Sequence, residues 1–232
     1  MLKRTISLVL LFVILTITTS IPSFAANSEN DRVSIKLRKI GLSVQEINNM
    51  DIRTRQEIAN NAISIASRKT VYYDVKEGEI VQKANIISPM LSSSDLSLTI
   101  TVYNYYPTNN RERLGIYANW DWATTPFFTL QDCLGVSWDS SIWRIANGSF
   151  INVQNWKYIN DTFIETQTSS SANYASSSGV GGNIDVKRFI FGSSVLDQWG
   201  YIYTVLEAQN TGSISGTSSI LSLIHISQGI VR

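Results

Sequence analysis

Residues 96–122 read LSLTITVYNYYPTNNRERLGIYANWDW. In the first half of this stretch, apolar residues alternate with hydroxyl-bearing residues, which is the pattern of a strand with one face in a core. Residues 107–110 supply a turn signal, and the alternation resumes after them. The stretch therefore predicts an antiparallel β-hairpin.

The two tryptophans of this hairpin, Trp120 and Trp122, lie on the same face as Ile116 and Ala118, because successive side chains of a strand point to opposite sides. Two buried faces coincide only if the numbers of paired residues add up to an even value. A sum near 220, allowing a slip of two, predicts the pairs Val102 with Ala118, Ile100 with Trp120 and Leu98 with Trp122. The tryptophans are then expected in the core.

The opposite face of the hairpin carries Tyr103, Tyr105 and Tyr117 together with Asn119 and Asp121. Tyrosine rings beside an amide and a carboxylate form a plausible flat binding surface, and we take these five residues as the candidate binding site. The alternative is that tyrosine and threonine are simply the residues that a solvent-facing strand favours.

The N-terminus has the features of a secretory signal peptide. Lys3 and Arg4 precede an apolar run over residues 6–17, and a small-x-small cleavage site follows at residues 23–25. We therefore expect residues 1–25 to be removed and the mature protein to be secreted, with no stable membrane span after cleavage. The alternative is that the apolar run anchors the chain, although it is short for a membrane-spanning helix.

Removing this segment takes two basic residues from 19, which leaves 17 against 18 acidic residues and a net charge of −1. A nearly neutral chain gives no electrostatic reason to expect nucleic acid as a partner.

Residues 26–69 are predicted to form a short helical leader. Residues 43–46 read SVQE and fit a helix capping box, and in a second helix Ile58, Ala62 and Ile65 share one stripe. From residue 70 the pattern changes to a period of two, so residues 70–232 are predicted to form the β domain.

Further strands are expected in the β domain at residues 134–138, 149–156, 186–191, 201–208 and 219–226. Many short strands separated by turn signals predict a mainly β fold, an antiparallel β-sandwich of the jelly-roll or Ig-like kind. Residues 162–184 are rich in Ser, Thr and Gly and are expected to form a surface loop or an edge hairpin. Alternatively, this segment refolds into a membrane barrel, as in a pore-forming or bacteriocin-like factor.

The chain has few groups that could perform chemistry. Its one histidine, His225, lies in an apolar strand pattern and is expected to be structural. Its one cysteine, Cys133, is expected to be a small buried hydrophobic residue. One His and one Cys cannot supply a zinc site. We therefore predict no catalytic residue, no metal site and no cofactor.

Glycoside hydrolysis remains as an alternative because it needs only two carboxylates. Asp121, Asp132 and Asp139 lie beside aromatic residues, but no spacing selects a pair among them.

Several segments taken together resemble uncharacterised secreted β-rich proteins of Gram-positive bacteria. They are the signal peptide, the lead IGLSVQEINNMDIRTRQEIAN, the stretch YANWDWATTPFFTLQDCLGVSW, the later GVGGNIDVK and the final strand with its histidine. The resemblance implies an extracellular location and a shared fold, and it carries no catalytic or binding residue. The expected function is a secreted, non-enzymatic protein that binds cell-wall or environmental polysaccharide or a surface protein.

Overall fold

The computed structural model describes residues 29–76, 79–82, 95–123, 131–159, 164–187, 189–190 and 193–212. The predicted signal peptide and the predicted strand at residues 219–226, which contains His225, lie outside these residues. The chain divides into two compact units between Ala59 and Asn60.

The first unit is helical in its described part. Residues 29–39 form a helix, and α2 (Val44–Asn49) and α3 (Ile52–Asn61) follow. The predicted capping box is confirmed, because the Glu46 backbone N–H donates to Ser43 Oγ at 3.2 Å and the Ser43 N–H donates to Glu46 Oε2 at 2.7 Å. No helix in the described part of the chain has both the length and the apolar character needed to cross a membrane.

The second predicted helix is wrong in its C-terminal half. α3 ends at Asn61, and β1 (Ala62–Lys76) begins at once and pairs with the predicted hairpin. Two irregularities of register, between Ala62 and Ser64 and between Ile65 and Ser67, interrupt the alternation of β1. The period of two that marks a strand is therefore hidden in the sequence until about residue 70.

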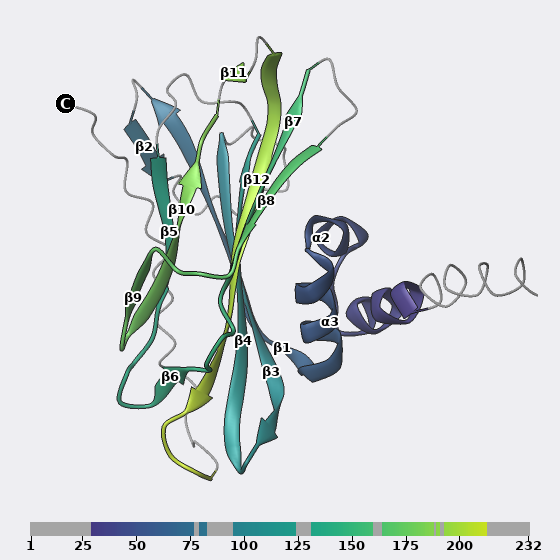
Figure 1. Ribbon diagram of the computed structural model, residues 1–232, viewed down its shortest axis with the longest axis vertical. Helices are drawn as coiled ribbons and strands as arrows, with labels where there is room; N and C mark the ends of the chain where they lie inside the picture. Colours follow the sequence, from purple (N-terminus) through teal and green to yellow (C-terminus); the bar gives the residue numbers. More distant parts are fainter. Residues whose placement is uncertain are drawn as a thin grey trace, which may run out of the picture. The chain divides into compact units, whose positions relative to one another are not determined.

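The second unit is mainly β, with two antiparallel sheets (Figure 1). The larger sheet has the order β2-β1-β3-β4-β12-β7-β8, with β6 and β11 also paired to β12, and the smaller has the order β5-β10-β9. The bounds are β2 (Glu79–Gln82), β3 (Leu96–Thr108), β4 (Arg111–Trp122), β5 (Gln131–Ser137), β6 (Trp143–Ile145), β7 (Ile151–Tyr158), β8 (Ile164–Ser169), β9 (Tyr174–Ser176), β10 (Gly179–Asp185), β11 (Phe189–Ile190) and β12 (Ser193–Ala208).

The hairpin β3–β4 is confirmed, with the predicted parity and a register shifted by two. The pairs are Leu96 with Trp122, Leu98 with Trp120 and Ile100 with Ala118. A two-residue turn with positive φ at Asn109 (51°) and Asn110 (58°) closes the hairpin, as type I′ turns do. An irregularity between Tyr105 and Thr108 then adds one residue to β3, which sets the final register.

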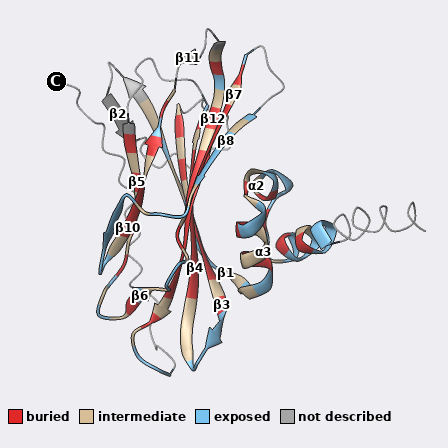
Figure 2. Ribbon diagram, viewed as in Figure 1, coloured by how far each residue is buried: buried red, intermediate tan, exposed pale blue. Residues whose placement is uncertain are grey.

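The main apolar core of the described residues contains side chains of both sheets. Trp120 and Trp122 of the large sheet and Leu134, Val136 and Val180 of the small sheet all belong to it. The prediction that the tryptophans are core residues is confirmed, since they are 1% and 4% exposed. Figure 2 shows buried residues along much of β4 and β12, the strands in the middle of the larger sheet.

The Ser, Thr and Gly-rich segment is built into both sheets in its described part. β8 forms an edge of the larger sheet, whereas β9 and β10 belong to the smaller one. Val180 and Ile184 of β10 are buried in the core, so the prediction of a surface loop is wrong for this strand. The predicted strands at residues 134–138, 149–156 and 201–208 fall on β5, β7 and β12. Among the described residues of the predicted strand 186–191, Phe189 and Ile190 form β11, whereas Val186 and Lys187 are outside any strand.

Candidate functional site

The predicted tyrosine surface is not open to solvent. Tyr103, Tyr105 and Tyr117 are 1%, 3% and 4% exposed, so the expectation of solvent-facing rings is wrong. Two of these rings pack against tyrosines of the neighbouring strand β12, so this face carries a packed tyrosine cluster. The hydroxyl of Tyr105 hydrogen-bonds that of Tyr203 at 2.6 Å, and the ring centroids of Tyr117 and Tyr201 lie 4.7 Å apart. These rings are packed, and the hydroxyls of Tyr105 and Tyr203 are used within the fold.

Asn119 and Asp121, the two polar members of the predicted site, are half-buried. Asp121 lies in a shallow hollow of about 450 Å³ together with Asp197, Ser97 and the exposed ring of Tyr72. Burial, and then the charge of Asp197, raise the pKa of Asp121 from 3.8 to about 6. The predicted tyrosines are thus packed within the fold, whereas Asp121 lies in a hollow beside a second carboxylate, Asp197.

A second hollow, of about 430 Å³, is lined mostly by amide side chains, and its lining residues come from both sheets. We call it the amide pocket. Its lining residues come from β7, β8, β10 and the segment before β9, and they are Asn152, Gln154, Gln167, Ser169, Asn173, Asn183 and Asp185.

The topology explains why amides gather at this place. β9 pairs with β10 only over residues 179–181, so beyond Gly181 this edge of β10 has no strand beside it in the described sheet. Side chains take over the role of the missing strand: Asn152 Nδ2 and Gln154 Nε2 donate to the backbone oxygen of Asn183 at 2.9 and 3.0 Å. The Asp185 N–H donates to Gln154 Oε1 at 2.6 Å. These bonds also fix which end of each amide is nitrogen and which is oxygen.

Gly182 is the residue that lets Asn152 reach β10. A Cβ atom at Gly182 would lie 2.5 Å from Asn152 Nδ2 and 2.8 Å from its Cγ. Any larger residue would therefore displace the Asn152 side chain. The glycine, whose backbone sits in an ordinary strand, is required by close packing of the pocket wall.

One atom of the pocket wall lacks a partner. Asn152 is 4% exposed and its Nδ2 is bonded, but its Oδ1 is buried without a hydrogen bond. A buried, unsatisfied acceptor costs roughly 1–3 kcal/mol, so a ligand that donates a hydrogen bond to it would gain affinity. Around this floor, Gln167, Asn173 and Asp185 form an exposed polar rim.

The other predicted chemical groups lie apart from this pocket or serve the fold. Cys133 is half-buried rather than buried, and burial and the neighbouring Asp132 raise its pKa. Asp132 is buried, which raises its pKa to about 6. Asp139 is exposed and accepts hydrogen bonds from the Ser141 hydroxyl and N–H, which lower its pKa.

Among the described residues, no group of three or more His, Cys, Asp or Glu side chains could hold a metal ion.

The residues of the amide pocket were not among the predicted site residues. Their one signal in the sequence is the run INVQNW at residues 151–156, where Asn152 and Gln154 share a strand face with Trp156. Amide side chains on the same strand face as a large apolar residue indicate that this face is buried at one end of the strand and polar at the other.

Comparison of the chain with protein-family models, with curated proteins and with solved structures gave no match in any of the three.

Proposed function

We propose that the protein is a secreted, non-enzymatic binding protein whose amide pocket holds a unit of cell-wall or environmental polysaccharide. In this proposal the signal peptide directs the chain out of the cell. The two sheets form an antiparallel β-sandwich of the jelly-roll or Ig-like kind, and the pocket opens at the end of its core.

The observation that carries the proposal is the buried, unpaired Oδ1 of Asn152 in a pocket of amides. Amide side chains offer donors and acceptors in fixed directions, and a carboxylate such as Asp185 offers acceptors only. A ring with several hydroxyl groups, each both donor and acceptor, matches such a wall. A charged ligand such as a phosphate would find no basic residue in the lining.

Titration calorimetry with two soluble probes tests the proposal. They are tetrasaccharides of β-1,4-linked N-acetylglucosamine and of β-1,4-linked glucose, which differ only in the acetamido group. Binding of at least one probe is expected. Gln167→Ala removes one hydrogen bond between the rim and the ligand, which is worth roughly 1.4 kcal/mol, so the variant should bind about tenfold more weakly.

The neighbouring Thr168 gives the matched control, since it is exposed on the opposite face of the same strand. Thr168→Ala should bind as the unchanged protein does. If neither probe binds, the proposed function is wrong. If the Gln167 and Thr168 variants bind equally well, the ligand does not use the amide pocket.

A glycoside hydrolase is the second candidate, and the hollow with Asp121 and Asp197 favours it. Two carboxylates of which one has a pKa near 6 can serve as acid and base, and Tyr72 beside them offers a ring for stacking. Release of reducing ends from the same tetrasaccharides, lost in Asp121→Asn and kept in Asp139→Asn, would establish this activity. A binding protein releases none.

A further inference from the structure

The outer face of the small sheet, next to the amide pocket, has a strip without side chains. Gly181 of β10 pairs with Gly135 of β5 on one side and with Tyr174 of β9 on the other. Residues paired across a sheet point to the same face, so the strip crosses β5 and β10 and ends at the tyrosine of β9. The strip forms the floor of a shallow hollow of about 540 Å³, which we call the glycine shelf.

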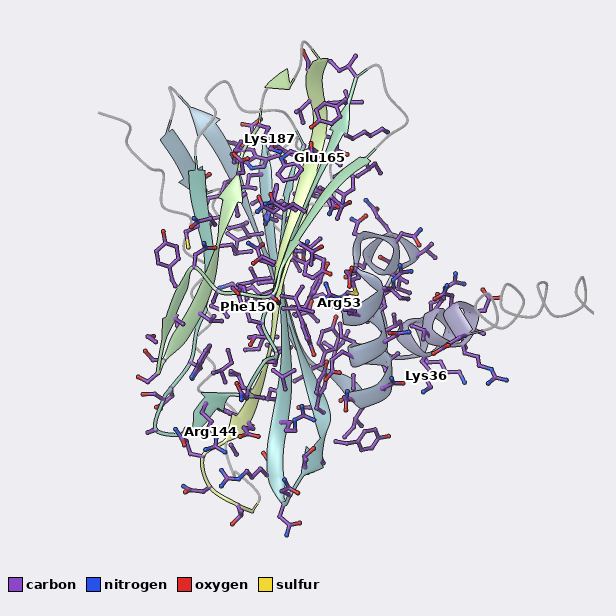
Figure 3. All side chains as sticks on the ribbon, viewed as in Figure 1. Lys36, Arg53, Arg144, Phe150, Glu165 and Lys187 are labelled. Atoms are coloured by element: carbon purple, nitrogen blue, oxygen red, sulfur yellow. The ribbon has the colours of Figure 1, made fainter. Side chains whose placement is uncertain are left out.

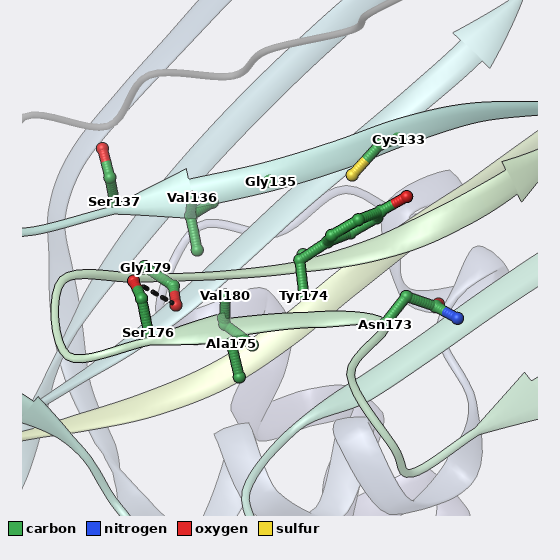
Figure 4. Close-up of a pocket in the computed structure, with 11 residues that line it drawn as sticks. Cys133, Gly135, Val136, Ser137, Asn173, Tyr174, Ala175, Ser176, Gly179 and Val180 are labelled. Carbon is green, nitrogen blue, oxygen red and sulfur yellow. Dashed lines mark hydrogen bonds between the residues drawn. The ribbon is translucent and has the colours of Figure 1, made fainter. Parts of the chain in front are cut away.

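The ring of Tyr174 lies over this shelf. Figure 4 shows it extending from β9 across β10 toward Cys133 of β5. Tyr174 is 56% exposed, so much of this ring remains accessible. A flat, exposed aromatic ring above a floor of glycines is a platform on which another flat apolar face, such as one face of a pyranose ring, can stack.

The glycine shelf and the amide pocket lie along the same strand face. Gly179, Gly181, Asn183 and Asp185 are alternate residues of β10 and therefore share one side of the sheet. The first two line the shelf, and the last two line the amide pocket. At about 3.3 Å per residue, these four positions span roughly 20 Å of strand.

Asn173 joins the two hollows, because it lines both of them. Its backbone N–H donates to the Gly181 oxygen at 3.0 Å, and its Oδ1 accepts from the Asn183 N–H at 2.9 Å. These two bonds hold Asn173 to β10 at the point where one hollow passes into the other. Its Nδ2 has no hydrogen-bond partner in the described part of the chain and can donate to a ligand that passes over it.

We infer that the amide pocket and the glycine shelf form one continuous site for a linear oligosaccharide. One sugar unit lies among the amides of β7 and β10, and the chain continues past Asn173 so that a later unit stacks on Tyr174. This inference rests on the proposed function and extends it, since it states that the ligand is a chain of linked rings rather than a single sugar. The polar pocket fixes one unit by hydrogen bonds, and the shelf adds affinity through ring contact.

The test compares chain lengths and two variants. The probes are N-acetylglucosamine and its β-1,4-linked tetrasaccharide, with the glucose series beside them. The tetrasaccharide should bind at least tenfold more tightly than the monosaccharide. Tyr174→Ala should remove most of that difference, because stacking on one aromatic ring is worth about tenfold in affinity, and it should leave binding of the monosaccharide unchanged.

Tyr106→Ala is the matched control, since Tyr106 is 58% exposed and lies on β3, away from both hollows. Gly135→Thr is a second variant that fills the shelf. A Cβ at Gly135 meets only the Val180 oxygen at 3.6 Å and Gly181 Cα at 3.9 Å, which are ordinary contacts, so the variant should fold. It should weaken binding of the tetrasaccharide alone.

The inference is overturned if monosaccharide and tetrasaccharide bind equally well, or if Tyr174→Ala and Gly135→Thr bind the tetrasaccharide as the unchanged protein does. In both cases the proposed function stands and the site ends at the amide pocket. If neither length of either series binds, the proposed function fails, and the continuous site fails with it.

Discussion

The ammonium nitrogen of Lys187 lies 3.6 Å from the centroid of the Trp156 ring. Figure 3 shows Lys187 and Glu165 close together near the start of β8, and the ammonium group is 3.2 Å from Glu165 Oε1. Trp156 Nε1 in turn donates to the backbone oxygen of Asp185 at 3.0 Å. These contacts connect the end of β10 to β7 and β8, and they hold the wall of the amide pocket in place.

Replacing Lys187 with methionine should therefore reduce stability. The variant keeps a flexible apolar side chain of similar length but removes the cation–π contact and the ion pair, so we expect a loss of about 1–2 kcal/mol in the free energy of unfolding. Urea denaturation measures it. Lys69→Met, at an exposed position of β1, is the control and should change stability by less than about 0.5 kcal/mol. Equal stability of the two variants would show that the contact with Trp156 contributes nothing.

Replacing Tyr117 with serine tests whether this ring serves the packing of the fold or the binding of a ligand. Because the ring packs on Tyr201 and is 4% exposed, its removal should cost about 3 kcal/mol in the free energy of unfolding. Binding of the tetrasaccharides by the folded fraction should be unchanged. A variant that is as stable as the unchanged protein but no longer binds would restore the tyrosine face as the ligand surface.

The hairpin and the candidate site differ in how far the sequence predicts them. Alternation and the Asn109-Asn110 turn are local signals, so the hairpin, its parity and the burial of Trp120 were predictable. The observed register differs from the predicted pairs by the slip of two that the prediction allowed, because an irregularity near Tyr105 leaves no mark in the pattern of apolar residues. Tyr105 itself looks like a surface residue, since only the neighbouring strand β12 supplies the partner for its hydroxyl.

The amide pocket was missed for a related reason. Its walls come from strands that the sequence separates by about thirty residues, and Asn152 becomes a pocket residue only when β10 lies opposite it. The serines and glycines around β10 indicate a loop, because composition does not distinguish a glycine in a turn from one that accepts a neighbouring side chain. Gly182 is of the second kind, and only the tertiary structure shows it.

The pKa of Asp121 predicts an unusual pH dependence of stability. The folded-state pKa of about 6 exceeds the ordinary value of 3.8, so between these values the folded state binds the proton more tightly than the unfolded state. The contribution of Asp121 to the free energy of unfolding is therefore fully present below about pH 4 and is lost as the pH rises through about 6. Asp121→Asn should unfold at higher urea concentration than the unchanged protein at pH 7, with a smaller difference at pH 4.

Asp139→Asn is the control for this measurement. The pKa of Asp139 is lowered by Ser141, so its contribution has the opposite sign and changes only below its ordinary value of 3.8. The stability of Asp139→Asn should therefore change between pH 4 and pH 7 by the same amount as that of the unchanged protein. If the stability of Asp121→Asn changes with pH in the same way as that of the unchanged protein, burial and the charge of Asp197 do not raise the pKa of Asp121 as stated.

Gly182→Ala tests whether the architecture of the amide pocket is needed for binding. The added methyl group would lie 2.5 Å from Asn152 Nδ2, so the Asn152 side chain must move and its hydrogen bond to the Asn183 oxygen breaks. We expect a loss of about 1–2 kcal/mol in the free energy of unfolding, and a loss of tetrasaccharide binding of at least about tenfold. Gly135→Ala adds the same methyl group to the neighbouring strand β5, where its nearest contact is 3.6 Å away, so it should leave stability nearly unchanged. Urea denaturation of the two variants measures the effect on stability, and titration calorimetry of Gly182→Ala beside the unchanged protein measures the effect on binding. If Gly182→Ala binds the tetrasaccharides as tightly as the unchanged protein does, Asn152 does not contact the ligand, and its unpaired oxygen belongs to the fold alone.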